Sequence, residues 1–114
     1  KYGKELYIVG DDLTGGNYKR TEKVIKEKCF NSIIVKPYEI GTITETIELV
    51  NLVRKNNVNY IVSTGNSETN DNIIADIATG LQSDFIKFGA PSRGERVCKY
   101  NRLWDIERNE LTQK

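Results

Sequence analysis

Apolar residues follow two alternating patterns along this chain. Short runs rich in β-branched and aromatic residues are typical of buried strands. Between them, apolar residues recur every three or four positions, which is typical of amphipathic helices. The pattern predicts strands at 6–10, 32–35, 59–62 and 85–87. It predicts helices at 18–28, 42–56, 71–81 and 92–104.

Capping residues stand where these helices are expected to begin. Thr42 precedes Glu45 by three residues, and Ser92 precedes Glu95 by three residues, which are capping-box spacings. Asn17 is a suitable N-cap for the first helix. These signals support the helix starts that the apolar periodicity predicts.

The third predicted helix follows a polar loop. We expect Glu68 and Asp71 to cap this helix, because carboxylates interact favourably with a helix N-terminus. The side chains expected to be buried by it are Ile73, Ile74, Ile77 and Leu81. In the preceding helix, the expected apolar face consists of Ile43, Ile47, Val50 and Val53.

Four strands that alternate with four helices predict a parallel sheet covered by helices. Two architectures fit: a small doubly wound sheet, or half of an eight-stranded βα barrel. We favour the half-barrel, because its strand ends converge on one mouth and each predicted strand here ends in polar residues. These are Asp11, Lys36, Ser63 with Thr64, and Lys87. A half-barrel exposes two sheet edges and therefore needs its other half, from the same chain or from a partner.

Composition narrows the class of protein. The 114 residues suffice for one domain, spanning 1–114, with 17 basic and 16 acidic residues interspersed. No basic face points to nucleic acid, and no apolar run approaches a membrane span, so we expect a cytoplasmic protein. Without histidine, a Cys/His zinc site is excluded, and we expect Cys29 and Cys98 to be buried thiols. Because the chain begins at Lys1 and lacks methionine, we expect a piece of a longer protein.

Several segments resemble the enolase family. Gly10-Asp11-Asp12-Leu13-Thr14, with Asn17 and Lys19-Arg20, is similar to the enolase segment GDDLTVTNPKR. Ile34-Val35-Lys36 followed by Glu39-Ile40-Gly41-Thr42 is similar to LLLKVNQIGS/T, and Ser67-Glu68-Thr69 with Asp71 to the end of SHRSGETED. Ile74-Ala75-Asp76 and Gly80-Leu81 match IADL...GL, and 86–101 resembles IKTGAPCRSERLAKYN. The resemblance implies the second half of the enolase C-terminal barrel.

The resemblance also implies a chemistry, the Mg²⁺-dependent interconversion of 2-phosphoglycerate and phosphoenolpyruvate. Asp11 would be a ligand of Mg²⁺, which prefers oxygen donors. Lys36 would be the general base, with its pKa lowered by burial and neighbouring cations. Lys87 would hold the substrate carboxylate. The other metal carboxylates of the family would lie in the first half of the barrel.

The chain departs from the family pattern after the third strand. Thr64-Gly65-Asn66 replace the His-Arg-Ser of the family segment, whose arginine clamps the substrate phosphate. Glycine offers no side chain for that contact, and threonine cannot carry the charge of the lost histidine. Nearby, Gly15-Gly16 replace Val-Thr and Tyr18 replaces proline.

Two hypotheses follow. In the first, a catalytically degenerate enolase-like protein serves as a structural or interaction subunit of a larger assembly or a homodimer. Its setting would be cytoplasmic, including cytoskeletal or ciliary assemblies. In the second, an active enolase is completed by sequence outside this chain. A third reading, an unrelated flavodoxin-like binding module, is disfavoured by the motif spacing. The first two differ at Thr64-Gly65-Asn66, and we favour the first.

Overall fold

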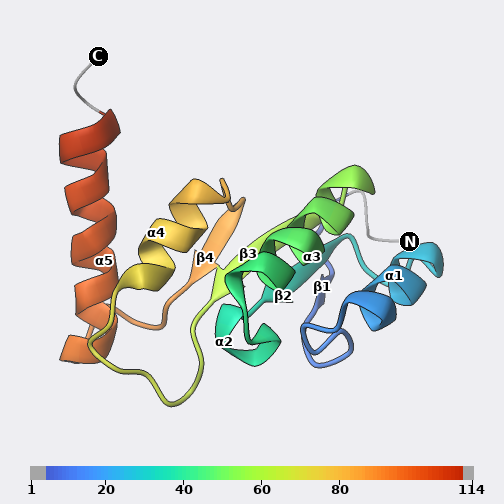
Figure 1. Cartoon of the computed structure of the whole chain (residues 1–114), viewed down its shortest axis with the longest axis horizontal. Coiled ribbons are helices and arrows are strands. Elements are labelled where there is room, and N and C mark those ends of the chain that lie inside the picture. The colour runs from blue at the N-terminus through green and yellow to red at the C-terminus, as the bar shows by residue number, and fades with distance from the viewer. Residues whose placement is uncertain (1–4, 112–114) are drawn as a thin grey trace.

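The computed structural model describes residues 5–111, with side chains described for 5–109. Strands and helices alternate along this part of the chain and follow one another across the molecule (Figure 1). The strands are β1 (Val9–Gly10), β2 (Ser32–Val35), β3 (Asn59–Ser63) and β4 (Phe85–Lys87). The helices are α1 (Tyr18–Lys26), α2 (Pro37–Ile40), α3 (Ile43–Lys55), α4 (Ile73–Gly80), α5 (Gly94–Ile106) and the π-helix η1 (Glu107–Leu111). The prediction of four consecutive βα units is confirmed.

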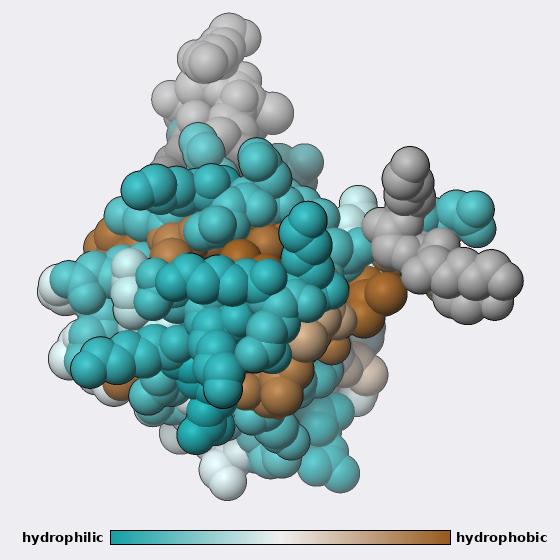
Figure 2. All heavy atoms as spheres, turned by 90° about the vertical axis from the view of Figure 1, so that its right-hand side faces the viewer, coloured by the Kyte–Doolittle hydropathy of each residue, from teal (hydrophilic) through white to brown (hydrophobic). Residues whose placement is uncertain are grey.

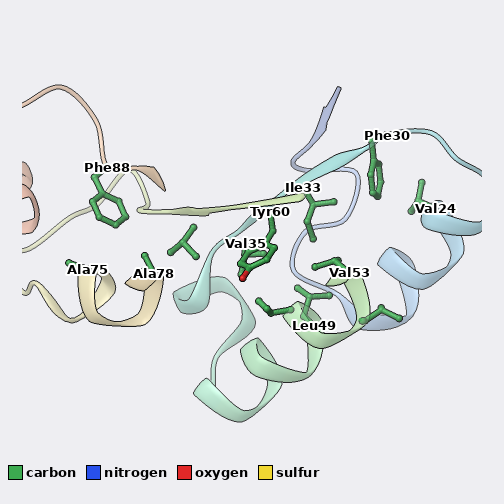
Figure 3. Packing of buried hydrophobic residues seen from close by; sticks show 13 residues of the cluster. Val24, Phe30, Ile33, Val35, Leu49, Val53, Tyr60, Ala75, Ala78 and Phe88 are labelled. Atoms are coloured by element: carbon green, nitrogen blue, oxygen red, sulfur yellow. The ribbon is translucent and has the colours of Figure 1, made fainter. Parts of the chain in front are cut away.

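The sheet is parallel, and its strand order is the chain order, β1-β2-β3-β4. In β2 and β3, Val35 is level with Val62, and Ile33 with Tyr60. These four side chains are buried in the core between the sheet and the helices, together with Leu49 of α3 (Figure 3). Because side chains alternate along a strand, the residues between them face the opposite side of the sheet.

That opposite side is concave. Tyr7, just before β1, makes an edge-to-face contact with Phe85 of β4, with ring centroids 5.0 Å apart. In a flat sheet these outer strands would stand three strand spacings, roughly 14 Å, apart. The contact therefore indicates a sheet that curves toward closure, as in half of a βα barrel.

The first strand is shorter than predicted. A strand over 6–10 was expected, but β1 contains only Val9 and Gly10. The side chain of Asn31 explains the difference, because it takes the place of a neighbouring backbone. Its Oδ1 accepts a hydrogen bond from the Ile8 amide (2.7 Å), and its Nδ2 donates one to the Leu6 carbonyl (2.8 Å).

Of the N-caps predicted for the first, second and fourth helices, two are confirmed. Asn17 accepts a hydrogen bond from the Arg20 amide, and Thr42 accepts one from the Glu45 amide. The capping box at Ser92 is wrong, because α5 begins one residue later than it requires. Arg93, with φ of 69°, stands before the helix, and no side chain caps it.

The predicted buried faces of α3 and α4 are partly wrong. In α3, Val50 and Val53 are buried as expected, but Ile43 and Ile47 are exposed. In α4, Ile73 is 58% exposed. The face of α4 that packs on the core consists of Ala75 and Ala78, whose small side chains allow close packing. Ile74, Ile77 and Leu81 are half-buried.

The surface carries both hydrophilic and apolar residues. On the side of α1, Figure 2 shows apolar atoms between mainly hydrophilic side chains.

Both thiols are free, but Cys29 is exposed and Cys98 half-buried, so the expectation of two buried thiols is wrong. In the described part of the chain, no helix is long and apolar enough to cross a membrane.

Candidate functional site

The polar residues at the strand ends lie on one edge of the sheet. Ser63 is level with Lys87 in the register of β3 and β4. Val35 is level with Val62, so Lys36 follows β2 at the height of Ser63. Asp11 follows β1 and reaches Lys36 directly. The structure thus brings Asp11 and Lys36 together and places Lys87 on the same edge.

Lys36 is surrounded by carboxylates. Its Nζ lies 2.7 Å from Asp11 Oδ1, 3.3 Å from Glu39 Oε1 and 3.9 Å from Asp12 Oδ1. The hydrogen bond to Asp11 is the largest effect on the Lys36 ammonium and raises its pKa above the ordinary value of 10.5. The sequence-based expectation was a lowered pKa. The direction is opposite because the groups that the described structure places against Lys36 are acids rather than cations.

Lys87 contributes its backbone to the end of β3. Its carbonyl accepts hydrogen bonds from the Thr64 amide (3.1 Å), the Thr64 hydroxyl (3.3 Å) and the Ser63 hydroxyl (3.3 Å). The Lys87 residue itself is exposed. Thr64 is therefore used to join β3 to β4, whereas Asn66 stands exposed in the loop that follows.

Gly65 is in contact with an aromatic ring. A β-carbon at this position would lie 2.7 Å from Cζ and 2.8 Å from Oη of Tyr38, well inside van der Waals distance. The Tyr38 hydroxyl donates to Glu39 Oε1 (3.2 Å). Partial burial, followed by the Glu39 carboxylate, raises the pKa of Tyr38, so its phenol is neutral at pH 7. Tyr38 belongs to α2, a helix that the sequence-based prediction left as loop.

A buried lysine holds the loop between β3 and α4. Lys99 of α5 is 1% exposed, and its Nζ lies 2.9 Å from Glu68 Oε2. It also donates to the carbonyls of Thr69 (2.9 Å), Asp71 (2.9 Å) and Glu95 (2.6 Å). The other Glu68 oxygen accepts from the Gly65 amide (2.7 Å).

The expected capping roles of Glu68 and Asp71 have different outcomes. Asp71 Oδ1 accepts from the Ile73 amide (2.8 Å) at the start of α4, so this prediction is confirmed. Glu68 instead pairs with Lys99, so its predicted capping role is wrong. Sequence reasoning missed Lys99. The signal was available, because Lys99 is spaced four and seven residues before Leu103 and Ile106, on the apolar side of α5.

A cavity of about 620 Å³ opens beside this loop, between α2, the start of α3 and α4. Tyr38, Gly65 and Glu68 line it, and so does the exposed Ile73 of α4. Two members of the altered Thr64-Gly65-Asn66 segment, Gly65 and Asn66, therefore line the cavity, and Gly65 lies directly against Tyr38.

A magnesium site needs several oxygen ligands close together, and the described residues do not gather them. Among them, no group of three or more His, Cys, Asp or Glu side chains could hold a metal ion. Asp11, the predicted ligand, has one carboxylate oxygen 2.7 Å from the Lys36 ammonium. These residues do not complete a Mg²⁺ site by themselves.

Two features define the class of protein. The parallel βα sheet curves toward closure, and an acid and two lysines lie at the carboxyl ends of its strands. It is a βα-barrel protein with its candidate site at the face where such barrels carry their chemistry. Comparison with known proteins gives the family. A family model described as "Enolase, C-terminal TIM barrel domain" matches residues 1–114, and the chain belongs to the enolase family.

Curated relatives agree with this assignment. The chain is 52% identical over 104 residues to the enolase of Sulfolobus acidocaldarius and 49% identical over 104 residues to that of Sulfurisphaera tokodaii. Each match covers 91% of this chain and 25% of the relative. The enolase of Saccharolobus solfataricus is 51% identical over 100 residues, covering 88% of this chain and 24% of the relative. The chain thus spans about a quarter of the length of these relatives.

Proposed function

We propose that this chain is the second half of an enolase-type barrel that has lost phosphate-dependent dehydration and serves as a structural or interaction part of a larger assembly. One observation supports this above the others. Gly65 stands where the family segment has arginine, and the ring of Tyr38 fills the space that a side chain there would need.

The loss matters because arginine binds phosphate through two parallel, charge-assisted hydrogen bonds. On the Gly65 side of the mouth, the carboxylates of Glu39 and Glu68 are paired with the ammonium groups of Lys36 and Lys99. A phosphate placed there would have to compete with these carboxylates for the lysines, because Gly65 supplies no cation of its own. Poor positioning of the substrate alone lowers rates severely, since catalysis depends on holding the reacting groups in place.

The state of Lys36 supports the same proposal. A general base must be deprotonated to accept a proton, and its ideal pKa lies near the working pH. The Asp11 hydrogen bond instead favours the charged ammonium. In this arrangement Lys36 serves as an ion-pair partner that joins β1 to β2.

The second candidate function is that of an active enolase. The retention of Asp11, Lys36 and Lys87 at the matching strand ends favours it. It requires that the rest of the protein supply both a substitute cation for the phosphate and the remaining Mg²⁺ ligands. Asp11 would then exchange its contact with Lys36 for the metal.

The chain matches only about a quarter of its relatives, and the rest of their length suggests what this chain binds. The other half of the barrel, in the same chain or another, is the first partner, because the curved sheet ends at two open edges. Beyond that half, we propose a protein assembly or a homodimer, in the cytoplasm or on a cytoskeletal or ciliary structure. Nucleic acid and membrane are not proposed partners.

The test is the dehydration of 2-phosphoglycerate by the full-length native protein with Mg²⁺, followed as phosphoenolpyruvate formation. The enolase of Sulfolobus acidocaldarius is the positive control. We expect no turnover above background from folded protein. A rate within tenfold of the control would overturn the proposal in favour of the active enzyme.

A further inference from the structure

Two of the departures from the family pattern meet at the same short helix. Gly16 follows Asp11 in the β1–α1 loop, and a β-carbon on it would lie 2.8 Å from Cγ1 of Ile40 in α2. Gly65 stands in the β3–α4 loop, and a β-carbon on it would lie 2.7 Å from Cζ of Tyr38 in α2. Glycine at both positions allows α2 to sit close against the two loops.

The Tyr38 residue is 53% exposed, and one hydrogen bond orients its phenol beside Gly65. Its hydroxyl donates to Glu39, and the same Glu39 oxygen is 3.3 Å from the Lys36 ammonium. Pro37 occupies the first turn of α2, where its fixed φ suits a helix start. Moving the phenol away from Gly65 therefore breaks the hydrogen bond to Glu39.

The Gly65 side is held by a hydrogen bond. Its amide donates to Glu68, which is paired with the buried Lys99. Moving the backbone at this position away from the ring would therefore disturb its hydrogen bond to Glu68. A side chain at position 65 and the phenol of Tyr38 compete for one volume.

We propose that Tyr38 is a specificity-determining residue, which closes the Gly65 side of the mouth to phosphate by occupying the space that a phosphate-binding side chain on residue 65 would need. This inference rests on the proposed function, and it identifies Tyr38 as the residue that occupies the space of the lost phosphate-binding arginine. It implies that the clamp cannot be restored by a change at residue 65 alone. The family segment LLLKVNQIG has the smaller asparagine at the position of Tyr38.

The test is a double-mutant cycle in the full-length protein, with inorganic phosphate as the probe and calorimetry as the readout. The variants are Gly65→Arg, Tyr38→Asn and the two combined. Tyr38→Phe combined with Gly65→Arg is the matched control, because it keeps the ring and removes the hydroxyl. Thermal unfolding of every variant verifies that it is folded.

We expect the Tyr38→Asn/Gly65→Arg protein to bind phosphate at least tenfold more tightly than the parent, whereas Gly65→Arg alone gains less than threefold. The phenylalanine control should behave like Gly65→Arg alone, because the ring still fills the space. Equal gains with and without Tyr38→Asn would overturn the inference, and so would a folded double variant that gains nothing. Turnover of 2-phosphoglycerate by the parent protein would overturn the proposed function. The phosphate affinities of the variants would still show whether Tyr38 blocks a side chain at position 65.

Discussion

Replacing Lys99 by methionine tests how the loop beside the candidate site is held. Methionine keeps the buried aliphatic part of the lysine side chain and removes only the ammonium. The Lys99 side chain is 1% exposed, and its ammonium lies 2.9 Å from the Glu68 carboxylate. The substitution leaves Glu68 without its cation and leaves the carbonyls of Thr69, Asp71 and Glu95 without this donor.

The magnitude follows from the burial of the pair. Removing one partner of a buried ion pair costs about 3–5 kcal/mol, because the other charge stays behind uncompensated. An exposed pair provides the matched control. Lys26 lies 3.2 Å from Glu22 on the surface of α1, with their side chains 72% and 47% exposed. Lys26→Met should cost only about 0.3–0.5 kcal/mol.

The assay is amide hydrogen exchange in the full-length protein, because it reports the opening of one segment without requiring two-state unfolding. A loss of about 3 kcal/mol in the free energy of opening corresponds to exchange roughly a hundredfold faster. We expect this at residues 64–72 in Lys99→Met and no comparable change in Lys26→Met. Less than about tenfold acceleration in that loop would refute the reasoning.

Three further predictions concern other contacts. Thr42→Ala removes the cap of α3 and should lower the free energy of unfolding, measured by chemical denaturation, by about 1 kcal/mol. The control Thr44→Ala, at an exposed position inside the same helix, should leave that free energy unchanged or raise it slightly. The hydrogen bonds from Arg102 of α5 lower the pKa of Asp76 below its ordinary value of 3.8. Asp76→Asn should therefore destabilise the protein fully above about pH 5, and this effect should vanish as the pH falls through the folded-state pKa of Asp76. Because the pKa of Lys36 is higher in the folded than in the unfolded chain, its ion pairs stabilise the fold at neutral pH. This contribution is lost only as the pH rises through the folded-state pKa of Lys36. NMR titration should therefore find Lys36 still charged at pH 10.5, and Asp11→Asn should lower its pKa.

The alternation of strands and helices was predictable because it depends on local periodicity. Ser32–Val35 is buried throughout, and Asn59–Ser63 alternates between buried and half-buried residues before ending in a buried serine, so both are recognisable as strands from sequence alone. The caps at Asn17 and Thr42 were predictable for the same reason, since a cap involves residues only three positions apart.

Features that depend on distant residues were not predictable. The Asn31 side chain shortens β1 across 23 residues of sequence, and Lys99 reaches Thr69 across 30. The contact between Tyr38 and Gly65 likewise joins α2 to the β3–α4 loop, which no short-range pattern connects. The positions of Asp11 and Lys36 at the strand ends were predicted, but their direct pairing was not, and it reversed the expected direction of the Lys36 pKa.

The most direct test of the central claim is the binding of 2-phosphoglycerate to the full-length native protein. Calorimetry with Mg²⁺ present measures this without requiring turnover. The loss of the arginine at position 65 and the ring of Tyr38 against it predict no saturable binding up to millimolar substrate. Enzymes commonly have KM values between about 1 μM and 1 mM. A dissociation constant within that range would contradict the account and show that another residue holds the phosphate.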